Sequence, residues 1–308
     1  CILLIIYTLF FGKAVQGNSG VDARAWLLLP GGITFQPSEL VKIGFIITFS
    51  KHLSFLNENN KIKDFTQVAF LALHAAVPMV LTHLQGDDGA AIIFFFMFIT
   101  MSFIAGVQLR YFIIIFALIL LLVPFLWKYV FAEYQKQRLI CQLNPESDPL
   151  GMGFQQIQGK LSIGSGGLFG QGLFNGPRVG YEVVPIQESD FIFSVVGEEL
   201  GFIGCIAVVL LLLGLCLRSL RIGSLSPDRQ GRYICFGFFG LIASQMIFNL
   251  GMCLSILPVM GVTLPFFSAG GSSAACLYLG LGLIQSVYTQ KDDSNRANIF
   301  HQNDIGYI

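Results

Sequence analysis

The stretch that decides the fold is residues 233–290, which read YICFGFFGLIASQMIFNLGMCLSILPVMGVTLPFFSAGGSSAACLYLGLGLIQSVYTQ and contain no Asp, Glu, Lys or Arg. A membrane-spanning helix needs roughly 20 mostly apolar residues, so this stretch is long enough for two such helices and a connecting turn. Residues that break helices mark the turn, namely Pro258, Gly261, Pro265 and the pair Gly270-Gly271. The stretch therefore predicts two membrane spans.

The composition extends this prediction to the whole chain. Hydrophobic residues make up 54% and charged residues 12% of the 308 residues, whereas soluble domains have about 25% charged residues. The formal net charge is zero, so nothing indicates a nucleic-acid partner. The seven cysteines lie mostly in apolar runs and show neither a disulfide framework nor zinc-site spacing.

Reading the apolar runs outward from 233–290 predicts eight membrane helices in a single domain that covers residues 1–308. Their ranges are 1–12, 39–54, 65–84, 89–108, 111–131, 190–217, 232–257 and 268–290. The fold class is therefore all-α, a polytopic membrane protein. Because the chain begins at Cys1, inside an apolar run and without an initiator Met, we expect it to be a fragment that lacks upstream sequence.

The distribution of Lys and Arg predicts the orientation, because these residues are enriched in cytoplasmic loops. Four basic clusters fall on one side of the membrane if the helices alternate, at 51–63, Arg110, 218–232 and 291–296. That side is then the cytoplasm, and residues 291–308 form a cytoplasmic tail. The opposite side receives one large extracellular loop, about 132–189, in which the polar residues are concentrated.

Eight short motifs follow one another along nearly the whole chain. They are Phe35–Glu39 (FQPSE), Gln85–Gly89 (QGDDG), Tyr134–Arg138 (YQKQR), Asn144–Gly151 (NPESDPLG), Lys160–Gly170 (KLSIGSGGLFG), Ser189–Phe193 (SDFIF), Gly197–Gly201 (GEELG) and Leu264–Ser272 (LPFFSAGGS). In this order and spacing the sequence resembles the SEDS family (shape, elongation, division and sporulation), which includes RodA, FtsW and SpoVE. The YQKQR and DPLG segments resemble RodA more than FtsW.

The resemblance implies a ten-helix fold in the bacterial cytoplasmic membrane, of which eight helices are visible here. It also implies a peptidoglycan glycosyltransferase that polymerises lipid II outside the membrane and releases undecaprenyl diphosphate. The implied partners are lipid II, membrane lipids and a class B penicillin-binding protein that cross-links the strands. Asp190 takes the place of the family's essential extracellular aspartate.

The chemistry of glycan extension fits an acid at this position. A sugar hydroxyl attacks an anomeric carbon and must lose a proton, so a positioned carboxylate such as Asp190 can act as general base. The departing diphosphate needs positive charge or a metal ion, for which Arg138 and Lys160 are candidates, Arg being suited to bidentate phosphate contact. A divalent cation, Mg2+ or Mn2+, stays open as a cofactor. Further candidates for substrate binding are Asp87, Glu188, Glu198 and Ser268.

Each of these residues also has a purely structural interpretation. Ser189 and Asp190 could cap the helix that follows them. Glu198, about 12 Å further along an ideal helix, could face the same cavity or pair with a neighbouring helix. The run Gly164–Gly167 lacks the ending of a P-loop, so a tight turn is favoured over a phosphate cradle. His74 and His83 are expected to be packed polar residues, and 270–273 a helix-breaking or close-packing element.

Two positions depart from the usual family pattern. Gly86 and Asp88 replace a Pro and a Leu around Asp87, and Glu188-Ser189 replaces a His-Thr pair before Asp190. A carboxylate at position 188 would raise the pKa of the proposed base by like-charge repulsion, or help to hold a cation.

Two rival functions use the same features. A transporter could move lipid II across the membrane without chemistry, although its key polar residues should lie near the bilayer midplane. A scaffold would only recruit the penicillin-binding protein. For such a partner, the small residues Gly237, Gly240, Ala243 and Ser244 offer a strip for helix packing.

Overall fold

The computed structural model describes residues 2–16, 22–28, 34–129, 131–144, 148, 151–181 and 183–305. The first half contains α1 (Ile2–Phe11), β1 (Lys13–Gln16), β2 (Asp22–Leu28), β3 (Thr34–Phe35), α2 (Pro37–Glu58), α3 (Phe65–Leu84), α4 (Asp88–Ala105) and α5 (Leu109–Tyr129). The second half contains α6 (Glu133–Leu143), α7 (Met152–Ser165), α8 (Pro177–Gly180), α9 (Ile192–Leu225), α10 (Arg229–Cys253) and α11 (Gly271–Ile305).

The long helices form a bundle around α10, which packs against α2, α4, α9 and α11. Local sequence signals set the helix ends. Pro37 starts α2, where a missing backbone N–H costs nothing. The Asp87 and Asp228 side chains accept hydrogen bonds from the first turns of α4 and α10, and Gly106 ends α4 in the left-handed conformation.

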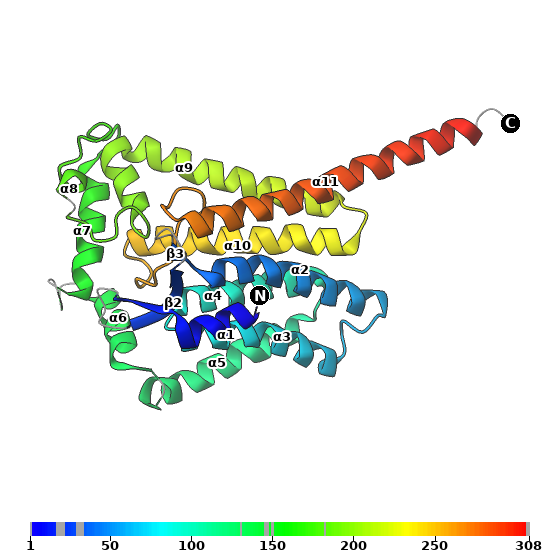
Figure 1. Cartoon of the computed structure of the whole chain (residues 1–308), viewed down its shortest axis with the longest axis horizontal. Helices are drawn as coiled ribbons and strands as arrows, with labels where there is room; N and C mark the ends of the chain where they lie inside the picture. The colour runs from blue at the N-terminus through cyan, green and yellow to red at the C-terminus, as the bar shows by residue number, and fades with distance from the viewer. Residues whose placement is uncertain are drawn as a thin grey trace.

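The two ends of the bundle are held by different contacts. At one end, Asn57 of α2 donates hydrogen bonds to the Ala105 carbonyl and the Tyr233 hydroxyl, and Tyr111 donates to the Lys63 carbonyl. This end carries the predicted cytoplasmic basic residues, and α11 projects beyond it (Figure 1). At the opposite end α6, α7 and α8 lie across the bundle (Figure 1), so the long loop and the basic clusters are on opposite sides, as the sequence predicts.

Five of the described helices are long and apolar enough to cross a bilayer, namely α3, α4, α5, α9 and α10. The predicted count of eight spans is therefore not confirmed by length and composition. With 10 residues α1 is short, and α2 carries two Glu and two Lys residues. The α11 helix runs 35 residues, through most of the predicted tail. The all-α polytopic class itself is confirmed.

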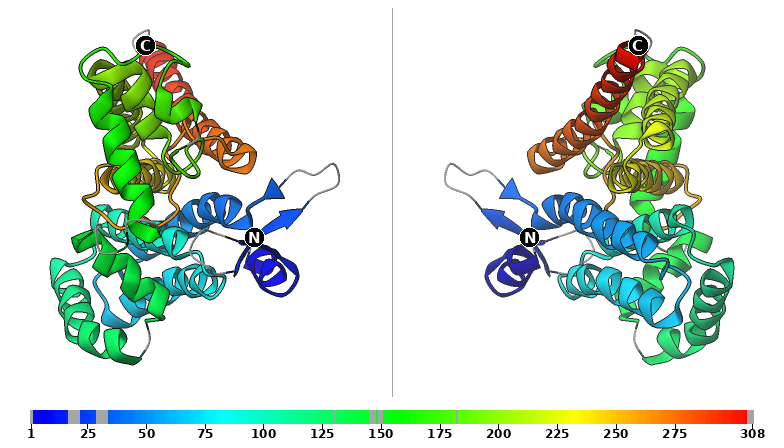
Figure 2. Two further views of the ribbon diagram at one scale, coloured as in Figure 1. Left: turned by 90° about the vertical axis from the view of Figure 1, so that its left-hand side faces the viewer. Right: turned by 90° about the vertical axis from the view of Figure 1, so that its right-hand side faces the viewer.

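The two long connections contain more regular structure than the sequence predicted. Residues 13–35 include a small antiparallel sheet of order β1-β2-β3, in which Leu27 pairs with Phe35. The sheet and α1 stand to one side of the bundle (Figure 2). The outer loop 132–189 contains α6, α7 and α8. A search for apolar runs misses the small sheet and the helices α6, α7 and α8, because none of them contains an apolar segment long enough to cross a membrane.

The small-residue strip of α10 does not face outward, so its interpretation as a partner surface is wrong. A Cβ on Gly237 would come within 2.9 Å of Met101 Sδ, and one on Gly240 within 3.2 Å of Thr100 Cβ. Both contacts come from α4, and Ser244 is also buried. The strip lets α10 and α4 approach closely within this chain.

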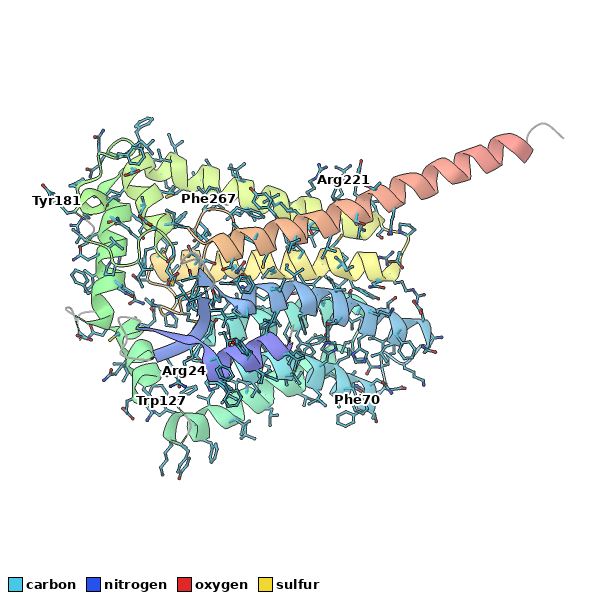
Figure 3. The ribbon with its side chains drawn as sticks, viewed as in Figure 1. Arg24, Phe70, Trp127, Tyr181, Arg221 and Phe267 are labelled. Atoms are coloured by element: carbon cyan, nitrogen blue, oxygen red, sulfur yellow. The ribbon has the colours of Figure 1, made fainter. Side chains whose placement is uncertain are left out.

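Cysteine labelling tests the orientation. Tyr181 is 84% exposed and lies at the end of the molecule opposite Arg221 (Figure 3). In intact cells we expect a membrane-impermeant thiol reagent to label Tyr181→Cys but not Ser224→Cys. The six described cysteines, Cys141 included, are buried and should give little background. Labelling of Ser224→Cys alone would reverse the topology.

Candidate functional site

Asp190 lies in a turn that leads directly into α9. Its backbone N–H and that of Ser189 both donate to the Ile186 carbonyl at 3.2 Å, and Ile186 has a φ of +55°. The N-cap residue of α9 is Phe191, so the helix begins just after Asp190. The Asp190 side chain is half-buried, and Ser189 Oγ donates to its Oδ1 at 3.2 Å. This turn fixes the direction in which the carboxylate leaves the chain.

The loop between α10 and α11 covers this turn. Ser268 Oγ donates to the Ser189 carbonyl at 2.6 Å and accepts from the Leu264 N–H at 2.7 Å. The Ala269 N–H donates to the Glu188 carbonyl at 2.8 Å. Glu188 and Ser268, both predicted for the site, are thus brought to Asp190. The Ser268 hydroxyl uses its proton to tie the two segments together.

Asn249 of α10 joins the same two segments, although it was not among the residues that the sequence predicted for the site. Its amide Nδ2 donates to the carbonyls of Asp190 and Val262, both at 2.8 Å. The residue is fully buried in α10. One amide group therefore sets the spacing between the Asp190 turn and the α10–α11 loop. The sequence feature that could have identified Asn249 is its position as a lone amide in the apolar run 246–254.

Asp87 lies on the other side of the α10–α11 loop. Its carboxylate accepts from the Ala90 N–H at 2.9 Å, from Gln36 Nε2 at 2.8 Å and from Ser38 Oγ at 3.4 Å. Burial raises the pKa of the Asp87 carboxyl, although the Ala90 N–H and the charge on Lys42 act in the opposite direction. The FQPSE and QGDDG motifs therefore meet at the ends of α2 and α4.

Two glycines allow the loop to pass between Asp87 and Asp190. A Cβ on Gly89 would lie 2.4 Å from the Met260 carbonyl oxygen. On the opposite side, Gly261 has a φ of +66°, and a Cβ there would lie 3.6 Å from Asp190 Oδ2. Residues 260–261 are thus in contact with both the α4 start and the Asp190 carboxylate.

A buried ion pair lies close to Asp87. Lys42 Nζ is 2.7 Å from Glu39 Oε1, and the two residues are 2% and 6% exposed. A charged pair is costly to bury in a membrane protein and by default indicates function. Their spacing of three residues in the sequence places the two side chains on one face of α2.

Glu198 does not reach the Asp190 turn. It is fully buried, and its Oε1 accepts from the Arg178 N–H at 2.8 Å. A Cβ on Gly176 would come within 2.9 Å of that oxygen. Of the two sequence interpretations, this contact agrees with pairing to a neighbouring helix, although α8 itself was not predicted. Glu198 holds the segment around α8 against α9, while its Oε2 has no partner within the part of the chain that is described.

Just beyond Glu198, α9 is broken at Gly201, which has a φ of 67° and a ψ of −163°. Residues 167–172 of the outer loop fill the break. The Gln171 and Gly172 N–H groups donate to the Glu198 and Glu199 carbonyls at 2.9 and 3.0 Å. On the other side, the Phe202 and Ile203 N–H groups donate to the Gly167 and Leu168 carbonyls at 2.9 and 3.2 Å. The glycine run is therefore a structural turn, as the sequence favoured.

The two cationic candidates, Lys160 and Arg138, lie on α7 and α6. Lys160 is exposed on α7. Its neighbour Gly159 packs against Phe191, where a Cβ would lie 2.9 Å from Cδ1, so α7 crosses the α9 start beside Asp190. Arg178 donates from Nη1 to Gln158 Oε1, which attaches α8 to α7. The Arg138 side chain lies outside the described residues; its backbone belongs to α6.

The predicted histidines have polar partners inside the chain. The Nδ1 atoms of His74 and His52 are 3.3 Å apart, and His83 Nδ1 is 2.6 Å from Asp88 Oδ1. Among the described residues no three His, Cys, Asp or Glu side chains form a group that could hold a metal ion. Within this described part of the chain, the side chains alone therefore do not make a complete metal site.

The fold and this site define a class of polytopic membrane proteins with an acidic site at the outer end of the bundle. A family model described as "Cell cycle protein" (FTSW_RODA_SPOVE) matches residues 1–293. The chain belongs to this FtsW/RodA/SpoVE family, which confirms the resemblance seen in its motifs.

Individual relatives agree with the family assignment. The chain is 34% identical over 291 residues to the peptidoglycan glycosyltransferase MrdB of Escherichia coli K12, covering 94% of this chain and 76% of MrdB. It is 36% identical over 292 residues to a probable peptidoglycan glycosyltransferase FtsW of Geobacter metallireducens, covering 94% of this chain and 75% of that protein. The two identities differ by too little to favour one of these relatives over the other.

A solved structure described as "Structural coordination of polymerization and crosslinking by a peptidoglycan synthase complex" has the same fold. It aligns with a TM-score of 0.78 at 32% identity, covering 94% of this chain and 78% of that chain.

Glycine substitutions test whether the contact between residues 167–172 and the break at Gly201 stabilises the fold. Alanine at Gly170 would place its Cβ 2.1 Å from the Glu199 carbonyl oxygen, and alanine at Gly201 would place it 2.3 Å from the Gly170 nitrogen. Both positions also have positive φ. We expect each variant to lose about 3 kcal/mol of stability from the combined backbone strain and clash, measured by thermal unfolding of the purified protein.

Gly164→Ala is the matched control, because a Cβ there meets nothing within 4 Å and alanine favours the helix by about 1 kcal/mol. Equal melting temperatures for all three variants would show that the loop does not support the break.

Proposed function

We propose that this protein is a peptidoglycan glycosyltransferase that polymerises lipid II, with Asp190 as the general base. The observation that carries the proposal is the position of Asp190, a half-buried carboxylate at the outer end of the bundle, held by Asn249 and the α10–α11 loop. Relatives with about the same identity are named peptidoglycan glycosyltransferases. A fixed acid at the membrane surface suits a substrate whose reacting sugar lies in the headgroup region.

The reaction requires one proton transfer and one substitution. A sugar hydroxyl of one substrate gives its proton to the Asp190 carboxylate, and its oxygen forms a bond to the anomeric carbon of the other substrate. The bond from that carbon to the diphosphate breaks, and the electron pair leaves with the lipid diphosphate. Positive charge must stabilise the leaving group. Lys160, on α7 next to the start of α9, is the first candidate for this positive charge. Arg138 of α6 is the second candidate.

Glu188, Ser268 and Asp87 support the site in different ways. Glu188 accepts a hydrogen bond at its carbonyl from the Ala269 N–H, so its backbone is anchored two residues from the base. Ser268 sets the distance between loop and turn. Asp87, with the nearby Glu39–Lys42 pair, provides a polar wall beyond the loop. Glu198 acts at a distance by holding α8, from which Arg178 reaches α7.

Transport of lipid II is the rival function with a specific observation in its favour, since buried charges such as Glu39 and Lys42 also occur in transporters. However, these residues lie within the first two turns of α2, near the outer end. A transport site is expected near the midplane. The placement favours chemistry over transport.

Substitution of the proposed base is the decisive experiment. Asp190→Asn keeps the size and the backbone hydrogen bonds but cannot accept the proton, so polymerisation of labelled lipid II by the purified full-length protein should fall by about 10²-fold or more. Lipid II binding and the melting temperature should change little. Glu188→Gln, the matched control for loss of a nearby charge, should reduce the rate far less.

A wild-type rate for Asp190→Asn would refute the general-base role. Lipid II movement across vesicles without any polymerisation by the wild-type protein would support transport. The same assay with EDTA, followed by Mg2+ or Mn2+, tests whether the reaction needs a divalent cation. A rate that does not respond to either addition would exclude a metal requirement.

We further propose a class B penicillin-binding protein as partner, because the solved relative is described as a complex that couples polymerisation to crosslinking. The two full-length proteins, co-expressed, should co-purify in detergent. Asp190→Asn should co-purify equally well, since the substitution keeps the size of the side chain and the backbone contacts that hold its turn. Failure of the wild-type pair to co-purify would contradict the partnership without affecting the polymerase assignment.

A further inference from the structure

A cavity lies between α9 and α11, at the end of the bundle opposite Asp190. Its volume is about 350 Å³. Eight residues from the two helices line it, namely Leu215, Arg218, Ser219, Ile222, Leu281, Gly282, Ile284 and Gln285. Ser219, Ile222 and Ile284 are buried and form its floor. Ser219 Oγ donates to the Cys235 carbonyl at 2.7 Å, so α10 closes the cavity from behind.

The lining changes from apolar to polar along the helix axes. Leu215 and Leu281 are nearer the middle of the bundle, whereas Arg218 and Gln285 are about one turn further toward the basic end. Both helices run in the same direction in this region (Figure 1). A ligand that follows this gradient has an apolar part toward the membrane centre and an anionic part at the surface, as a phospholipid of that leaflet does.

The positive charge of the arginines at the mouth of the cavity is not neutralised by an ion pair with any described side chain. Neither Arg218 nor the neighbouring Arg221 takes part in an ion pair that the described residues form. Arg221 is exposed on α9 at the basic end, close to where α11 leaves the bundle (Figure 3). Anionic lipids of the cytoplasmic leaflet attract basic residues placed at this depth.

We propose that this groove binds one phospholipid with an anionic headgroup from the cytoplasmic leaflet. Arg218, with Arg221 next to it, contacts the headgroup, Gln285 faces the ester region, and an acyl chain enters between Leu215 and Leu281. The cavity volume is at the lower end of the range for ligand pockets, about 300–1,000 Å³. The cavity can therefore hold part of a lipid molecule.

Gly282 provides a way to block the groove without disturbing the packing. It lines the cavity, and a Cβ there meets nothing within 4 Å, so the side chain of Gly282→Leu can occupy the space meant for the acyl chain. Gly214→Leu is the matched control, because Gly214 also has open space around its Cβ position but is not among the lining residues. Both changes replace a helical glycine with the same residue.

Arg218→Gln tests the charge separately, with Lys61→Gln as control. Lys61 is exposed at the same end of the bundle and belongs to the turn between α2 and α3. Binding is measured by native mass spectrometry of the full-length protein, titrated with phosphatidylglycerol and with phosphatidylcholine. We expect the wild-type protein to bind one phosphatidylglycerol in preference to phosphatidylcholine. Arg218→Gln should bind phosphatidylglycerol about fivefold more weakly than wild type, and Gly282→Leu should lose at least fivefold as well. Both controls should stay within about twofold of wild type.

Four outcomes would overturn the proposal. Equal binding of the two lipids by the wild-type protein would remove the charge preference. Unchanged binding by Gly282→Leu would place the lipid elsewhere, and a loss in Lys61→Gln equal to that in Arg218→Gln would indicate general surface attraction. Displacement of phosphatidylglycerol by an equimolar amount of undecaprenyl diphosphate would assign the groove to a lipid diphosphate instead. Melting temperatures confirm that the variants are folded.

Discussion

The architecture depends on how one broken helix satisfies its backbone. At Gly201 the hydrogen-bond ladder of α9 is interrupted, and buried N–H and C=O groups without partners would each be costly. Residues 167–172 provide those partners through four backbone hydrogen bonds between 2.9 and 3.2 Å. The close approach requires glycine at 166, 170 and 201, where a Cβ would overlap backbone atoms. The outer loop is therefore an integral part of the bundle.

This constraint positions the catalytic end of the molecule. With residues 167–172 fixed, α7 is held across the start of α9, where Gly159 contacts Phe191. The turn that carries Asp190 is then enclosed by α7, by Asn249 of α10 and by the loop containing Ser268. Ser268 and Ser189, which are 79 residues apart in the sequence, are joined there by a hydrogen bond. Rigid support of this kind is what a general base needs, because proton transfer requires a fixed distance to the reacting hydroxyl.

The sequence predicted the long apolar helices, the two ends of the bundle and the motifs that gather at the outer end. Apolar runs report which segments avoid water, and that signal is strong for α3, α4 and α10. They do not report which face of a helix meets a neighbour, so the small residues of α10 were assigned to a partner instead of to α4. The break at Gly201 was also missed, because its hydrogen bonds come from a distant loop and leave no local pattern. Asn249 and the Glu39–Lys42 pair were visible as isolated polar residues, but their partners are set by tertiary contacts.

The position of the break also bears on the choice between chemistry and transport. Residues 202–225 alone are about 36 Å long at 1.5 Å per residue, which is enough to cross a hydrocarbon core of about 30 Å. The part of α9 before Gly201, with Glu198 and Glu199, then lies at the outer surface of the membrane. The first turns of α2 and α4, with Glu39, Lys42 and Asp87, lie at the same level. Gly89 contacts the loop that covers Asp190, and the Gln36 N–H donates to Ser272 Oγ at the start of α11. The ionisable groups of the site therefore share one interface, where a lipid-linked sugar is presented, and not the midplane that a transport site would occupy.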